Sequence, residues 1–183
     1  MDLNRFNHAL EFAAQRHHGQ HYKFNDEHHQ ISHVYFVGAV LLSYGFSEDT
    51  VIAGVLHDIV EDTKTTLEEV RQAFGDTVAS YVEQETIDQT LPWEERQHLM
   101  QERAKSAPAD VKAIKTADIL HHLVLQTAPE HTKTQANYMV EHSPEKALWK
   151  YESILAALGT GWEHPLHDEA TVYLEKMKLK YAQ

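Results

Sequence analysis

The chain has 183 residues, 42% of them hydrophobic and 24% charged, a composition typical of a globular protein with an apolar core. It contains no cysteine, which excludes a disulfide framework and a thiolate metal site. The formal net charge of −12 disfavours binding to a nucleic-acid polymer or an anionic membrane. The N-terminus lacks the pattern of a signal peptide, and no segment approaches the roughly 20 apolar residues of a membrane helix. We therefore expect a cytoplasmic protein with no membrane partner, and the composition leaves the oligomeric state open.

Helical spacing of apolar residues recurs along the chain, and alternating strand-like runs are hard to find. The first helix is predicted to end near Gly19, and the polar residues 20–30 are predicted to form a loop. Ser32 is a candidate N-cap for a helix from about His33 to Tyr44. Capping residues, proline and glycine predict further helices that start at 47–49, after 65–66, after Pro92 and after Pro144. They also predict helices that span about 76–86, 109–127 and about 166–181.

These elements predict an all-α, bundle-like fold of roughly eight to ten helices. We find no internal repeat, no low-complexity tract and no linker long enough to separate two domains. Residues 1–183 are therefore expected to form one domain.

The most informative segment of the chain places four ionisable residues directly after an apolar helical run, residues 51–56. They are His57, Asp58, Glu61 and Asp62. On a continuous helix, His57 lies one turn before Glu61 and Asp58 one turn before Asp62, so all four side chains share one side. Ionisable groups beside a buried run are costly unless they are paired or hold a metal. A neighbouring histidine and aspartate suit a divalent cation, and two further carboxylates can orient water. The segment therefore indicates a hydrolase site.

Two ligands do not complete a metal site, and two other polar residues occupy otherwise apolar helices. His33 opens the segment His33–Val37, and Asp118 lies among small and apolar neighbours in 113–120. Taken singly, each has an ordinary explanation: His33 as a cap or surface residue, and Asp118 as a partner of Lys115.

Together these residues resemble the HD superfamily of metal-dependent phosphohydrolases, within it the RelA/SpoT hydrolase branch and its small stand-alone metazoan SpoT homologues. The resemblance runs from about residue 5 to 125. Its ordered motifs are the histidine–glycine–glutamine run in 14–20, His33, the pair His57-Asp58, the run 61–63, residues 66–68 and 74–75, the central stretch with Thr86, Asp88, 91–92 and Arg96, and the final Lys115, Ala117 and Asp118. Residues 129–183 are expected to form a helical C-terminal part that carries none of these motifs.

The resemblance implies a divalent metal, usually Mn²⁺, held by His33, His57, Asp58 and Asp118. Glu61 and Asp62 would then orient and deprotonate the attacking water. The reaction of that branch removes the 3′-pyrophosphate from guanosine tetra- or pentaphosphate, so the implied partner is a small phosphorylated nucleotide.

The chain departs from the branch where the nucleotide is bound. Lys23 is present, but Tyr22 replaces an arginine, and a tyrosine ring can stack on a purine without adding charge. After Asp118, Ile119 replaces a basic residue and His122 replaces an asparagine that contacts the nucleotide. Tyr22, Lys23 and His122 are therefore the candidate substrate contacts.

Three functions follow from these observations. The first is a metal-dependent phosphohydrolase with guanosine tetraphosphate as the substrate to try first. The second keeps the metal but acts on another nucleotide or a sugar phosphate, as the altered residues allow. The third is a non-catalytic domain that binds a nucleotide or a metal, which would have no need of the Glu61-Asp62 pair.

Overall fold

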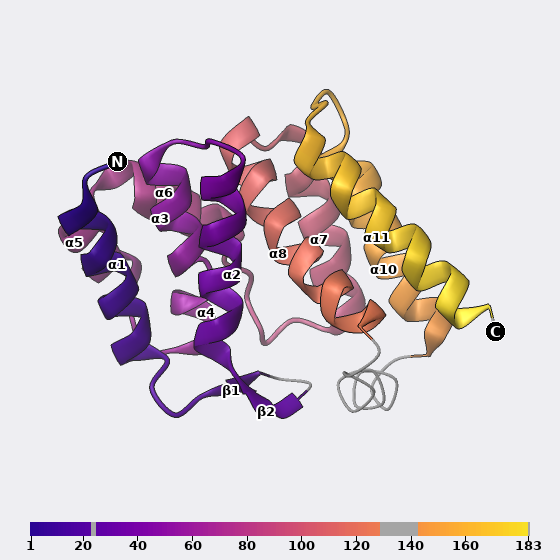
Figure 1. Cartoon of the computed structure of the whole chain (residues 1–183), viewed down its shortest axis with the longest axis horizontal. Helices are drawn as coiled ribbons and strands as arrows, with labels where there is room; N and C mark the ends of the chain where they lie inside the picture. The colour runs from indigo at the N-terminus through magenta and orange to yellow at the C-terminus, as the bar shows by residue number, and fades with distance from the viewer. Residues whose placement is uncertain (23–24, 129–142, 183) are drawn as a thin grey trace.

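The structure is a computed structural model that describes residues 1–22, 25–128 and 143–182. In this part of the chain the fold is helical apart from one short hairpin, which confirms the predicted all-α class (Figure 1). Among the described residues, no helix is both long and apolar enough to cross a bilayer.

The N-terminal part carries α1 (Leu3–Arg16), β1 (His21–Tyr22), β2 (Asn25–His29), α2 (Gln30–Ser43), α3 (Glu48–Leu56), α4 (Ile59–Asp62), α5 (Leu67–Phe74) and α6 (Asp76–Glu85). The rest of the described chain forms α7 (Trp93–Ser106), α8 (Ala109–Thr127), α10 (Pro144–Leu158) and α11 (Pro165–Tyr181). Helices α1 and α5 lie at one end of the molecule, α10 and α11 at the other, and α2 and α8 between them (Figure 1).

Local signals set several helix ends where they were expected. Thr66 and Glu69 form a reciprocal capping box at the start of α5, which satisfies two backbone N–H groups. Gly75 follows that helix with a φ of 92°, a conformation that a residue with a Cβ rarely adopts. Pro144 occupies the first turn of α10, where its missing N–H costs nothing.

Two predictions about residues 20–33 are wrong. Instead of a loop, β1 and β2 pair antiparallel, with His21 opposite His29 and Tyr22 opposite Asn25. Helix α2 begins at Gln30 and not near His33, so Ser32 lies inside the helix. The backbone N–H of Gln30 donates to the carbonyl of Gln20 at 3.1 Å, and this bond from the preceding segment replaces a capping side chain.

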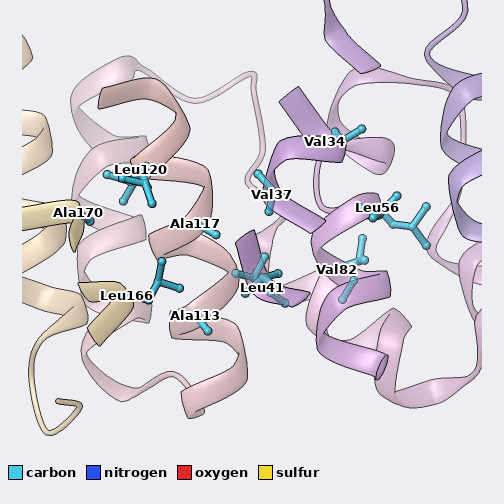
Figure 2. Packing of buried hydrophobic residues seen from close by; sticks show 14 of the residues in the cluster. Val34, Val37, Leu41, Leu56, Val82, Ala113, Ala117, Leu120, Leu166 and Ala170 are labelled. Carbon is cyan, nitrogen blue, oxygen red and sulfur yellow. The ribbon is translucent and has the colours of Figure 1, made fainter. Parts of the chain in front are cut away.

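The core centres on α2, which packs against α3 on one side and α8 on another. Val37 and Leu41 of α2 lie close to Ala113 and Ala117 of α8, and α8 also carries Leu120 in the same packed layer (Figure 2). Full burial of a valine or leucine side chain contributes about 1.5–3 kcal/mol to the stability of the fold.

Two glycines allow α2 and α3 to approach closely. A Cβ on Gly38 would overlap the side chain of Val55, and a Cβ on Gly54 would overlap that of Leu41. This close contact fixes the start of α2 relative to the end of α3. His33 precedes Gly38 in α2, and His57 follows Gly54 at the end of α3. The close packing of the two helices therefore brings the two imidazoles together.

Candidate metal centre

The sequence pattern suggested that the His57-Asp58 pair lies within one continuous helix, but the structure interrupts the helix there. Helix α3 ends at Leu56, and α4 begins at Ile59. The Nδ1 atom of His57 donates to the Gly54 carbonyl at 2.8 Å, so the imidazole is hydrogen bonded to one of the last backbone carbonyls of α3. Asp58 then has a ψ of −5°, and its carbonyl accepts the N–H of Asp62 at 2.9 Å. The helix is interrupted at the pair, and both side chains lie close to His33 near the start of α2.

Four predicted ligands converge from three separate segments. The Nε2 atom of His33 lies 3.2 Å from Nε2 of His57, 3.4 Å from Oδ2 of Asp58 and 3.3 Å from Oδ1 of Asp118. His57 Nε2 lies 3.1 Å from Oδ1 of Asp58 and 3.9 Å from Oδ1 of Asp118. The histidine side chains are at most 2% exposed, whereas those of Asp118 and Asp58 are 12% and 23% exposed. The cluster is therefore open on its carboxylate side.

The donor atoms fall into two overlapping groups that share His33. One contains His33, His57 and Asp58, and the other contains His33, Asp118 and His122. Within each group every donor atom lies within 4.8 Å of the others.

The donor chemistry fits a divalent cation. Because His57 Nδ1 donates to a carbonyl, a neutral His57 presents the lone pair of Nε2 to the cluster. Nδ1 of His33 is held 2.7 Å from Nδ1 of His121, so Nε2 of His33 also faces the cluster. Two imidazole lone pairs and two carboxylates at 3.1–3.4 Å repel one another unless a positive charge lies among them.

The pKa values also reflect this need for positive charge. Burial works to lower the pKa of His57, but Asp58 and Asp118 outweigh burial and raise it to about 10. Burial works to raise the pKa of Asp118. The charge of Lys115 and, to a smaller extent, His122 outweigh burial and lower this pKa well below its ordinary value. The carboxylates of the cluster thus favour a positive charge beside the ring of His57.

Lys115, which is partly buried, and Glu85, which is buried, form an ion pair beside the cluster. The Nζ atom of Lys115 lies 2.8 Å from Oε2 of Glu85 and 3.1 Å from Oδ2 of Asp118. Burial works to lower the pKa of Lys115, but Glu85 and Asp118 raise it well above its ordinary value, so the amine stays charged. Lys115 thereby fixes one oxygen of Asp118 and leaves Oδ1 facing His33, His57 and His122.

Glu61 and Asp62, the predicted water-activating residues, lie in α4 and line the same cavity as His33, Asp58 and Asp118. One oxygen of Glu61 accepts the backbone N–H of Ile87, and the other accepts the side-chain amide of Gln89 at 2.7 Å. Burial raises the pKa of Glu61 to about 7. The backbone carbonyl of Asp62 accepts a bond from Gln20 at 2.6 Å, which ties the start of the hairpin to α4.

The three predicted substrate contacts are placed differently from one another. Lys23 lies outside the described residues. Tyr22 is only 4% exposed, and its hydroxyl is hydrogen bonded to Nδ1 of His122. The Nε2 atom of His122 lies 2.9 Å from Oδ1 of Asp118. Both Tyr22 and His122 line the cavity, but their polar atoms face each other and the carboxylate of Asp118.

The cavity beside the cluster has a volume of about 250 Å³ and combines carboxylates with cations. Arg96, Lys115 and Lys150 line it together with Trp93 and Met100. The Nε atom of Arg96 is buried and has no hydrogen-bond partner in the described part of the chain. A buried N–H of this kind is a donor available to an anionic ligand.

Reasoning from the sequence missed three polar residues around the cluster. Gln30 donates to Oδ2 of Asp58 at 2.8 Å and lies 3.4 Å from Oδ2 of Asp62. Glu85 and His121 are both buried, against Lys115 and His33 respectively. His121 could have been singled out, because it is an ionisable residue in the apolar stretch of α8. Gln30 and Glu85 could not, because their partners are 28 or more residues away along the chain.

The helical fold and the cluster of histidine and aspartate define the chain as a member of the HD domain family, which it matches over residues 9–143. Among curated proteins it is similar to guanosine-3′,5′-bis(diphosphate) 3′-pyrophosphohydrolase MESH1. The Xenopus tropicalis and human proteins are each 40% identical over 117 residues, and the Drosophila melanogaster protein is 35% identical over 121 residues. The first two alignments cover 63% of this chain and 65% of the relative, so the matched part is a little under two thirds of those relatives' length.

Two solved structures share the fold over most of the chain. One is described as a metazoan orthologue of SpoT that hydrolyses ppGpp; it has a TM-score of 0.79, is 28% identical, and the match covers 98% of both chains. The other is a Listeria monocytogenes EGD-e protein with a TM-score of 0.67 and 30% identity, covering 81% of this chain and 96% of that one. The first match extends the similarity to the C-terminal helices, where the sequence resemblance ended.

Proposed function

We propose that this protein is a metal-dependent phosphohydrolase that acts on a phosphorylated nucleotide, first of all as a guanosine-3′,5′-bis(diphosphate) 3′-pyrophosphohydrolase. The observation that carries the proposal is the convergence of His33, His57, Asp58 and Asp118 beside a cavity that also holds Glu61 and Asp62. The names of the MESH1 relatives supply the substrate.

The proposed metal ligands are His33, His57, Asp58 and Asp118. When bound, a divalent cation offsets charge on the phosphoryl group and lowers the pKa of a nearby water. Mn²⁺ is the ion that we propose to test first, because mixed imidazole and carboxylate ligands accommodate it. The two carboxylates of this set balance the charge of one divalent cation, while Lys115 is balanced by Glu85.

Glu61 is the proposed general base, and Asp62 is proposed to orient the water. Two hydrogen bonds, from the backbone of Ile87 and from Gln89, hold the Glu61 carboxylate in one orientation. A pKa raised by burial to about 7 matches proton transfer near neutral pH. The water oxygen would bond to the phosphorus that is attached to the ribose O3′ atom. Glu61 would take the proton from water as the P–O3′ bond breaks, and O3′ would leave as a hydroxyl by taking that proton back from Glu61.

Arg96 and Lys150 are the proposed phosphate contacts of the cavity. Arg96 contributes a buried Nε–H without a partner in the described chain, and Lys150 adds positive charge on the same cavity. These residues supply local attraction for a polyphosphate in a protein whose net charge is −12. We also retain the cytoplasm as the proposed location of the reaction.

A second candidate substrate is another phosphorylated nucleotide or a sugar phosphate. The observation in its favour is the burial of Tyr22, whose polar end is engaged by His122. A tyrosine in this position has little ring surface available for stacking on a guanine.

The test is incubation of the Mn²⁺-loaded protein with a panel of 3′-pyrophosphorylated, 3′-phosphorylated and 5′-phosphorylated nucleotides. We expect release of pyrophosphate from guanosine 3′,5′-bis(diphosphate), and no release by an Asp58→Ala control. Release of a 5′-phosphate instead would favour the second candidate. Tight nucleotide binding without turnover of any panel member would show a non-catalytic binding domain and overturn the proposal.

A further inference from the structure

The imidazole of His122 is arranged like those of His33 and His57. In each of the three, Nε2 faces the carboxylates of the cluster. For His122 the nearest such atom is Oδ1 of Asp118 at 2.9 Å, the same oxygen that lies 3.3 Å from His33 Nε2.

The opposite nitrogen of each ring is held from outside the cluster. Nδ1 of His57 is bonded to the Gly54 carbonyl, Nδ1 of His33 to His121, and Nδ1 of His122 to the hydroxyl of Tyr22. Histidines that ligate metals almost always carry such an outer hydrogen bond, which fixes the ring and its tautomer. The arrangement is therefore repeated three times around one cluster.

From this repetition we infer that His122 is a third imidazole ligand of the cation, held in place by Tyr22. The inference rests on the proposed function, because it extends the four proposed ligands by a fifth. His122 lies one helical turn after Asp118 in α8, so both project from the same face toward His33. Tyr22 is then a positioning residue that accepts the Nδ1–H of His122 and leaves the Nε2 lone pair for the metal.

Two consequences follow for the chemistry of the site. Three imidazoles with two carboxylates favour Fe²⁺, Co²⁺ and Zn²⁺ over Mn²⁺ more than two imidazoles do, because nitrogen ligands suit the later ions. A fifth protein ligand also leaves fewer positions for water and substrate than four would. The residues at positions 22 and 122 therefore act on the metal and not on the nucleotide base.

Direct counting of imidazoles tests the inference on the intact protein. The Co²⁺-loaded wild-type chain, the His122→Asn variant and the Tyr22→Phe variant are compared by X-ray absorption at the cobalt edge. We expect three imidazoles in the wild type, two in His122→Asn and three in Tyr22→Phe. Titration with Co²⁺ is expected to show an affinity loss for His122→Asn that exceeds the roughly 10–100-fold loss typical of an outer partner, and a loss within that range for Tyr22→Phe.

The outcomes separate this inference from the function on which it rests. Two imidazoles in the wild type, unchanged in His122→Asn, would overturn the inference, even if the wild type hydrolyses its nucleotide. A wild-type chain that binds no divalent cation would overturn both. The wild-type count alone is decisive if a variant fails to fold.

Discussion

The Nε2 atoms of His33 and His57 face each other at 3.2 Å, although the two residues lie on different helices. Neither ring can turn away, because His57 is bonded to the Gly54 carbonyl and His33 to His121 on their other sides. The close packing of α2 against α3 through Gly38 and Gly54 sets this separation. A structural contact between two apolar helices thus determines the geometry of a polar site.

Enlarging Gly38 tests that connection. Gly38→Ala places a methyl group against Val55, and overpacking of this kind costs about 1–3 kcal/mol of unfolding free energy. We expect this loss in chemical denaturation together with weaker metal binding. Gly45→Ala is the matched control, because Gly45 has a positive φ but open space around it. It should cost about 1 kcal/mol through backbone strain and leave metal affinity unchanged. Equal effects of the two variants on metal affinity would contradict the connection.

Replacing Glu61 tests the proposed base. Glu61→Gln keeps the shape of the side chain but removes its basicity, so kcat should fall by about 10²–10⁴-fold with little change in KM. Metal content should stay at the wild-type level. The control is Glu68→Gln, which changes an exposed glutamate on α5 and should have no effect on kcat. If Glu61→Gln retains wild-type turnover across the pH range, another group accepts the proton.

Removing the charge of Lys115 should destabilise the fold. Lys115→Met leaves Glu85 buried without its partner, and breaking a buried ion pair costs about 3–5 kcal/mol. Glu85→Gln in the same chain should restore part of that loss, because the uncompensated charge disappears. Lys105→Met breaks an exposed pair with Glu102 and should cost no more than about 1 kcal/mol. Urea denaturation of the four chains measures these differences, and equal losses for Lys115→Met and Lys105→Met would refute the role of the buried pair.

Metal binding should release protons. The pKa of His57 is about 10 in the metal-free protein because nearby carboxylates outweigh burial, so its ring is protonated at neutral pH. A cation at Nε2 must displace that proton, and affinity should therefore rise by about tenfold per pH unit for each proton displaced, up to the pKa. Calorimetry in two buffers of different ionisation enthalpy measures the release directly. A binding enthalpy independent of buffer would mean that His57 is not deprotonated on binding.

The sequence predicted the all-α fold well, because apolar periodicity and capping residues act locally. Ionisable residues in apolar helices made His33 and Asp118 candidates beside His57-Asp58, but only the resemblance to HD phosphohydrolases joined the four into one ligand set. The structure brings these four together. Their role as ligands remains a prediction.

What the sequence could not predict depends on contacts between distant segments. The helix is interrupted at His57-Asp58, where the His57 side chain bonds to the Gly54 carbonyl, and helical periodicity does not reveal this interruption. The local hairpin of β1 and β2 was missed for a different reason: its residues are mostly polar and lack the alternation of apolar and polar side chains that predicts strands. The contact between Tyr22 and His122 joins positions 100 residues apart, so two departures from the family pattern could not be recognised as partners.

The proposed function requires that a single metal site hydrolyses a phosphorylated nucleotide. The most direct measurement is chromatographic separation of the products formed from guanosine 3′,5′-bis(diphosphate) by the Mn²⁺- or Co²⁺-loaded protein and by its His57→Ala variant. We expect GDP and pyrophosphate from the wild type and neither from the variant. Equal product from both chains, or none from either across the nucleotide panel, would contradict it.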